Sequence, residues 1–198
     1  MTGARPRRLP LYGLVSAYLV SECGTAMAAI AIPWLVLVTT GSAASTGVIG
    51  FAQMAPYVVA QATGGPLADR IGLRRTCVLG NVAAAVPMCA IPLLHAHGDL
   101  HLGALAALVA VAGAVRGLAD AATTPLIPMT AAVGEVASER AAGIYSAANR
   151  SAMLIGMPLA GVLIAVTSAP TVVLIDGLTF AVAAAVIVAV LPRSMATV

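Results

Sequence analysis

Five ionisable side chains stand inside long apolar stretches of this 198-residue chain, and they are the residues best suited to chemistry: Glu22, Arg116, Asp120, Arg150 and Asp176. An unpaired charge in hydrocarbon costs about 2.5 kcal/mol or more, so such residues usually pair with each other or serve proton and ion pathways. Carboxyl groups in this setting can exchange protons or hold cations, and arginines can hold anions. Each of the five is therefore a functional candidate.

The composition indicates that the surrounding solvent is a lipid bilayer. Hydrophobic residues make up 61% of the chain and charged residues only 9%, with a mean hydropathy of +1.02. This leaves far too little polar surface to coat a soluble globule. The net charge is +3, and all ten basic residues are arginine.

Six segments are long and apolar enough to cross a bilayer as helices, which takes about 20 residues each. The expected spans are 11–38, 46–62, 76–94, 102–125, 141–166 and 172–191, after a basic arm over residues 1–10. The first span is too long for the apolar region of a signal peptide and contains Glu22 and Pro33, so we interpret it as a retained helix. The predicted fold is an all-α integral membrane bundle of six helices.

The helix map places three of the candidate residues at one depth. With a rise of 1.5 Å per residue, Asp120 and Arg150 lie about 16 Å from the cytoplasmic ends of their helices, and Glu22 about 18 Å. Arg116 and Asp120 are four residues apart and share a helix face. We therefore expect Arg116, Asp120 and Arg150 to form one buried network where the first, fourth and fifth spans converge.

The residues allow both a functional and a structural interpretation. Glu22 is the best candidate for a carboxyl group that titrates a proton or binds a cation, and the alternative is a protonated, hydrogen-bonded structural residue. The same two interpretations stay open for Arg116 and Asp120. For Asp176 and Arg150 we expect structural pairing.

The distribution of arginines predicts the membrane orientation. Eight arginines fall on one side if the N-terminus is cytoplasmic, and the outer connectors contain none: Arg5, Arg7, Arg8, Arg70, Arg74, Arg75, Arg140 and Arg193. Positive residues concentrate on the cytoplasmic side of membrane proteins. Both termini are then expected in the cytoplasm, in a bacterial inner membrane, where the basic arm can contact anionic headgroups.

The most specific motif is residues 64–79, GGPLADRIGLRRTCVL, where charges interrupt two apolar stretches. We expect a charged hinge in a tight turn at the membrane surface. The stretch resembles the loop between helices 2 and 3 of major facilitator superfamily transporters, whose pattern is G-x-L-A-D-R-x-G-R-R. The matching residues are Gly65, Leu67, Ala68, Asp69, Arg70, Gly72 and Arg74. Leu73 departs from the pattern, and Arg75 extends the basic cluster.

The resemblance implies further roles for this chain. In that family the six-helix halves contain an inverted three-plus-three repeat, and residues 64–69 (GGPLAD) are echoed here by residues 156–161 (GMPLAG). An arginine on helix 4 often belongs to the proton-coupling machinery, which makes Arg116 the candidate. Gly156, Pro158 and Gly161 on the fifth span resemble the antiporter signature, and residues 175–180 (IDGLTF) resemble drug and siderophore efflux members.

The expected function is proton-coupled efflux of a small hydrophobic compound, performed together with a second six-helix half. Complete members of the family have about twelve helices, so three explanations stay open: a fragment, a homodimerising half-transporter, or a remnant without transport. A remnant that binds other membrane proteins is the alternative function. A passive channel is disfavoured, because no filter-like loop or polar ring is visible.

Other chemistries have little support in the sequence. Cys23, Cys77 and Cys89 lack metal-ligand spacing and an even count. His95, His97, Asp99 and His101 could bind zinc, but side chains of this kind usually keep an exposed connector polar. Phosphate loops, nucleophile elbows and basic patches with interleaved aromatic residues are absent, so we predict no cofactor, no metal, no enzymatic activity and no nucleic-acid partner.

Overall fold

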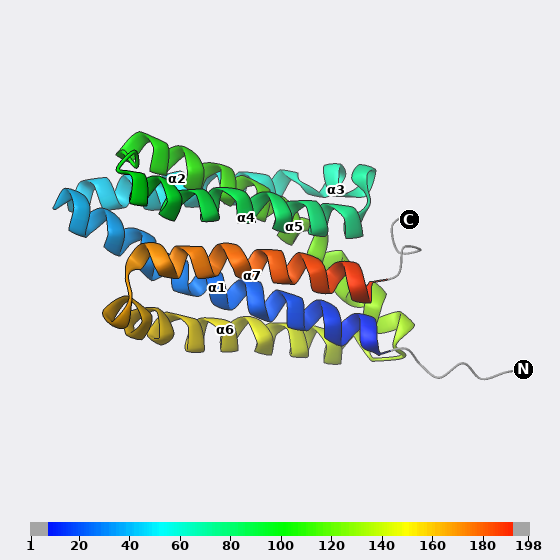
Figure 1. Cartoon of the computed structure of the whole chain (residues 1–198). Coiled ribbons are helices and arrows are strands. Elements are labelled where there is room, and N and C mark those ends of the chain that lie inside the picture. The colour runs from blue at the N-terminus through cyan, green and yellow to red at the C-terminus, as the bar shows by residue number, and fades with distance from the viewer. Residues whose placement is uncertain (1–7, 192–198) are drawn as a thin grey trace, which may run out of the picture.

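The structure is a computed structural model that describes residues 8–191, and within that range it contains helices and no strands (Figure 1). The helices are α1 (Leu9–Thr40), α2 (Ala43–Thr63), α3 (Gly65–Ile71), α4 (Leu73–His97), α5 (Leu102–Val133), α6 (Ser138–Val166) and α7 (Ala169–Val190). Six of them, all except α3, are long and apolar enough to cross a membrane. This confirms the predicted all-α bundle of six spans.

The six long helices pack as two groups of three that are joined in the middle (Figure 1). Helix α1 packs against α6 and α7, α5 packs against α2 and α4, and α4 joins the groups by packing against α7. If α1, α2 and α4 are exchanged with α5, α6 and α7, in that order, the same pairs of neighbouring helices result. Consecutive spans alternate in direction, so α1 and α5 run in opposite senses. This is the packing pattern expected of an inverted repeat.

Small residues bring the paired helices together. Gly113 and Gly117 on α5 face the backbone of α2, where a β-carbon at either position would overlap the carbonyl oxygen of Gln53 or Tyr57. Gly156 on α6 packs in the same way against the Cys23 carbonyl of α1. In a bilayer, close backbone packing of this kind replaces the hydrophobic effect as a source of helix association.

The helices extend beyond several of the expected boundaries. The largest difference is in α5, which continues through Pro125 and Pro128 to Val133, where the sequence suggested an end at residue 125. Proline is tolerated within membrane helices because neighbouring helices and hydroxyl side chains can satisfy the freed backbone groups.

The expected tight turn at residues 64–72 instead contains the short helix α3. Pro66 lies in its first turn, where its missing N–H is not needed, and Gly72 ends it with φ 96° before α4 begins. Only glycine adopts that backbone conformation without strain. The motif is therefore a helix between two spans, with the chain direction changed at Gly72.

Arginines gather at one end of the bundle. Helix α3, the start of α1 and the end of α7 lie at the same end (Figure 1), which also holds Arg8, Arg70, Arg74, Arg75 and Arg140. Connectors 41–42, 98–101 and 167–168, at the opposite end, contain no arginine. Within the basic arm over residues 1–10, Arg5 and Arg7 lie outside the described residues, as does Arg193.

Arg74 joins two helix ends at this arginine-rich end. Its Nε donates to the Leu191 carbonyl at 2.9 Å and its Nη2 to the Val188 carbonyl at 3.0 Å. These carbonyl groups belong to the end of α7, where a positive side chain satisfies free acceptors and the helix dipole together. The start of α4 is thereby fixed to the end of α7, whereas Asp69, Arg70 and Arg75 are exposed.

Helices α2 and α6 are the least buried of the six spans. Ile49 is the one buried residue of α2, and α6 buries only small residues, namely Ala141, Ala148, Ala152, Gly156 and Ala160. In the described part of the chain these two helices do not pack against each other. The bundle therefore has an open side between α2 and α6.

Candidate functional site

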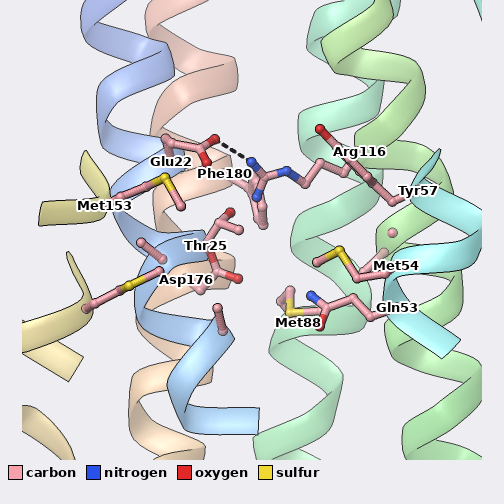
Figure 2. A pocket seen from close by; sticks show the side chains of 15 residues that line it. Glu22, Thr25, Gln53, Met54, Tyr57, Met88, Arg116, Met153, Asp176 and Phe180 are labelled. Carbon is pink, nitrogen blue, oxygen red and sulfur yellow. Dashed lines mark hydrogen bonds and ion pairs between the residues drawn. The ribbon is translucent and has the colours of Figure 1, made fainter. Parts of the chain in front are cut away.

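A cavity of about 200 Å³ lies at the centre of the bundle (Figure 2). All six long helices contribute to its wall. The lining residues are Glu22, Thr25, Ala26, Ala29, Gln53, Met54, Tyr57, Met88, Ala112, Gly113, Arg116, Met153, Met157, Asp176 and Phe180. Apolar and methionine side chains form most of the wall, and a few polar groups converge on it, as in sites that bind small molecules.

Arg116 lies between two carboxyl groups at one end of this cavity. Its Nη2 donates to Glu22 Oε2 at 2.5 Å, the contact drawn in Figure 2, and its Nε lies 3.7 Å from Asp120 Oδ2. The three side chains are 13–15% exposed. Charged groups this far from solvent interact strongly, and removal of one partner strongly destabilises the folded protein. The predicted proximity of Arg116 and Asp120 is present, and Glu22 completes the cluster.

A chain of hydrogen bonds continues from this cluster to the surface of α2. The Tyr57 hydroxyl donates to Asp120 Oδ2 at 3.1 Å, and the exposed Gln61 donates through Nε2 to the Tyr57 hydroxyl at 3.1 Å. Polar contacts therefore run from Gln61 through Tyr57, Asp120 and Arg116 to Glu22. The chain of contacts thus links the buried charged cluster to an exposed residue of α2.

Two polar atoms of the cavity wall are buried without a hydrogen-bond partner among the described residues: Arg116 Nη1 and Asp176 Oδ1. Asp176 is only 2% exposed, and the ion pairs of residues 8–191 do not include it. The expected structural pairing of Asp176 is therefore missing. Arg116 also stacks near Phe180, with 5.6 Å between its guanidinium carbon and the ring centroid. Unsatisfied buried polar groups are costly, and in a cavity they mark places for ligand or water.

Arg150 does not join the network that the sequence suggested. It is exposed on the face of α6 that also carries Met153, Leu154 and Met157. The reason is helical geometry, since α6 packs on α1 through Ala148 and Ala152, and a residue two positions from each points to the opposite side. The prediction considered only the depth of Arg150 in the membrane, whereas its side chain points away from Arg116 and Asp120.

The antiporter-like residues of α6 also divide between its two faces. Gly156 is buried against α1, where a β-carbon would lie 2.8 Å from Ala26 Cβ and from the Cys23 carbonyl oxygen. Pro158 and Gly161 are exposed, and Gly161 has open space around it. Of these three residues, only Gly156 packs closely against α1.

Several residues of the site were not singled out from the sequence. Tyr57 and Gln61 are polar residues four positions apart on α2, a spacing that places them on one helix face and that the pattern of charged residues does not reveal. Tyr18 is another, because Asn149 Nδ2 donates to its hydroxyl at 2.5 Å and its ring lies 4.4 Å from that of Tyr145. These residues link α1 to α6 beside the cavity. Their proximity depends on which helices are neighbours.

Two histidines near the connector between α4 and α5 make hydrogen bonds at helix ends. His101 accepts a hydrogen bond from the Ala104 backbone N–H through Nδ1 at 3.1 Å and thereby caps α5. His97 Nδ1 lies 2.8 Å from the Leu93 carbonyl oxygen near the end of α4. Within residues 8–191, no group of three His, Cys, Asp or Glu side chains is placed to hold a metal ion.

The fold and cavity define a class: a multi-pass membrane protein with six spans arranged in two groups of three around a central polar cluster. A sequence profile for the Major Facilitator Superfamily matches residues 14–197, nearly the whole chain. The chain therefore belongs to the Major Facilitator Superfamily, as the motif at residues 65–75 indicated, and it is a multi-pass membrane protein.

Curated relatives agree with this assignment. The multidrug efflux pump Tap of Mycobacterium tuberculosis is 27% identical over 176 residues, which cover 87% of this chain and 42% of that pump. The multidrug efflux pump Tap of Mycolicibacterium fortuitum is 28% identical over 166 residues, with 80% and 40% covered. The chain thus spans about two fifths of the length of the curated relatives that it matches.

Proposed function

We propose that this chain forms one half of a proton-coupled exporter of small hydrophobic compounds. The observation that carries the proposal is the position of Arg116, held between Glu22 and Asp120 in the wall of a central, mostly apolar cavity. The Tap relatives are multidrug efflux pumps, and the mostly apolar cavity suits the binding of an apolar compound.

The cluster supplies a means of coupling. A proton that binds Glu22 removes its negative charge and weakens its contact with Arg116, which then turns toward Asp120. Loss of that proton restores the first pairing. Because each pairing changes the polar surface of the cavity, the two charge states favour different occupants and different helix arrangements. Glu22 is the proton-binding residue in this scheme, and Arg116 is the positioning residue.

A second six-helix unit completes the transporter in this proposal. The sparsely buried α2 and α6 face the open side of the bundle, and the matched relatives are more than twice as long as the matched segment. Rocking of the two units about the cavity would expose it alternately to each side of the membrane. We further propose that the arginine-rich end and both termini are cytoplasmic, in the inner membrane.

The mass of the detergent-extracted native complex tests the need for a second unit. Twice the 19.6 kDa chain mass, or a mass that includes another six-helix segment, is the expected result. A monomeric complex of this chain alone would contradict the proposal and support a remnant without transport.

Transport itself is tested in everted membrane vesicles that contain the native complex. Imposing an acidic interior should drive uptake of ethidium, followed by its fluorescence, and collapse of the gradient by a protonophore should stop that uptake. Vesicles lacking the chain provide the control. Equal uptake with and without the chain would overturn the proposed export.

A further inference from the structure

The Asp176 carboxyl group has no assigned role and lies in an unusual setting. It is 2% exposed, its Oδ1 has no hydrogen-bond partner in the described part of the chain, and it forms part of the cavity wall on α7. Figure 2 shows it beside Thr25, across the cavity from Met88 and Gln53. A buried carboxyl group without partners is costly, so an occupant that satisfies it gains a large interaction.

Within residues 8–191, Asp176 forms no ion pair with Arg116, the cation in the wall of the same cavity. Arg116 bonds to Glu22 and lies beside Asp120, and its guanidinium stacks near Phe180. Two carboxyl groups therefore share the one guanidinium, and Asp176 is the third carboxyl group of the site. Among the ionisable residues that line the cavity, Glu22 and Arg116 pair with each other, and Asp176 is left without an ion-pair partner in the described part of the chain.

The packing against α1 holds Asp176 in place. A β-carbon on Gly24 would lie 2.7 Å from Asp176 Oδ1 and would overlap the Thr179 hydroxyl, so the carboxyl group fits against a helix surface that only glycine leaves open. The Thr179 hydroxyl donates to the Asp176 backbone carbonyl at 2.7 Å and not to its side chain. The carboxyl group is thus positioned without being satisfied.

The remaining wall fits an apolar body attached to such a positive group. Met54, Met88, Met153 and Met157 come from three different helices, α2, α4 and α6, and line the cavity. Methionine side chains are flexible and polarisable, and they adapt to ligands of different shape. A volume of about 200 Å³ accommodates a single small ring with a short side chain.

We propose that Asp176 is a recognition site for the protonated amine of a small amphipathic ligand, whose apolar part contacts the methionines. This inference rests on the proposed function, since it names the substrate class of the same cavity. The ammonium group donates to the Asp176 carboxylate, and no bond is made or broken. Glu22 and Arg116 keep the separate coupling role described above.

The test uses the native complex in lipid nanodiscs and isothermal titration calorimetry, with empty nanodiscs as the blank for partitioning. The probes are 2-phenylethylamine and its neutral counterpart 2-phenylethanol, which differ in the amine alone. A charge-assisted hydrogen bond in a buried site predicts that the amine binds the unmodified protein roughly tenfold or more tightly than the alcohol. Equal affinity of the two probes would overturn the inference without any variant.

Variants then locate the contact. Asp176→Asn should remove the preference for the amine and leave 2-phenylethanol binding unchanged, whereas Asp99→Asn, the same change in the exposed outer connector, should preserve the preference. If Asp176→Asn still prefers the amine over the alcohol, another residue recognises the amine, and the inference is overturned. Because binding is measured without a gradient, lost ethidium uptake with intact Asp176-dependent binding would overturn the proposed export alone.

Discussion

Arg116 and Glu22, 94 residues apart in the chain, meet in a hydrogen bond of 2.5 Å between α5 and α1. The contact joins the two groups of three helices near the midpoint of the bundle. Asp120, one turn along α5, lies on the other side of the same guanidinium. The pair therefore has a structural role, since it connects the groups, and a proposed mechanistic role, since a second carboxyl group competes for the arginine.

The structural role predicts strong energetic coupling between Glu22 and Arg116. Arg116→Gln leaves two carboxyl groups without a cation and should lower the free energy of unfolding by about 3 kcal/mol or more. In a double-mutant cycle with Glu22→Gln, the coupling energy should be about 1 kcal/mol or more, measured by unfolding in mixed SDS micelles. Glu139 and Arg140 are exposed and form no ion pair within residues 8–191, so they provide a control cycle in which coupling should be near zero. Additive effects at Glu22 and Arg116 would contradict the contact.

The packing of α6 on α1 predicts opposite effects of one substitution at two glycines. Gly156→Ala introduces a methyl group against the Cys23 carbonyl and should destabilise the bundle by about 1–3 kcal/mol. Gly161→Ala enters open space on the same helix and should be neutral or stabilising by up to about 1 kcal/mol, because alanine favours helix more than glycine does. Unfolding midpoints of the two variants check the order. A larger loss in Gly161→Ala would disprove the orientation of α6.

The link between α4 and α7 predicts different roles for adjacent arginines. Arg74→Gln removes two hydrogen bonds to the last turn of α7 and should destabilise the bundle by about 1–2 kcal/mol. Arg75→Gln changes an exposed side chain and should stay within about 0.5 kcal/mol of the unmodified protein. Hydrogen exchange at the end of α7 should rise only in Arg74→Gln. Equal protection in both variants would count against the cap.

The outward direction of Arg150 leads to a contrast with Arg116. Arg150→Gln should change the stability of the six-helix unit by no more than about 0.5 kcal/mol, because the side chain has no ion-pair partner within residues 8–191. Arg116→Gln, the same change in the cluster, should cause a several-fold larger loss. The measurement is again unfolding in mixed micelles. A comparable loss of stability in both variants would indicate that Arg150 belongs to a buried network.

Much of the architecture was predictable from local sequence, because bilayer thickness and the cost of charge dictate where apolar segments begin and end. The six spans, the family motif and the proximity of Arg116 to Asp120 follow from composition and helical spacing. Features that depend on neighbouring helices did not follow. Depth alone placed Arg150 beside Asp120, whereas the small residues Ala148 and Ala152 direct it outward.

The same limit applies to the partners of the site. Nothing in the sequence around Glu22 indicates Arg116 as its partner, because the contact depends on how α1 lies against α5. Asp176 was expected to be paired, and only the packed bundle shows that Arg116 is engaged elsewhere. Helix α3 was missed because a glycine- and proline-rich stretch with charges resembles a turn, although Pro66 is placed where a helix can begin.

Proton-driven flux in Glu22→Gln tests the central claim most directly. With the native complex in vesicles, the account predicts that this variant loses pH-gradient-driven ethidium uptake while it still inserts, assembles and exchanges ethidium at equilibrium, because glutamine keeps the size of the side chain and a hydrogen-bond acceptor for Arg116 but cannot bind the proton. Asp99→Asn, which neutralises an exposed carboxylate outside the cavity, should transport as the unmodified protein does. Unchanged gradient-driven uptake in Glu22→Gln would remove Glu22 from the coupling mechanism and contradict the account.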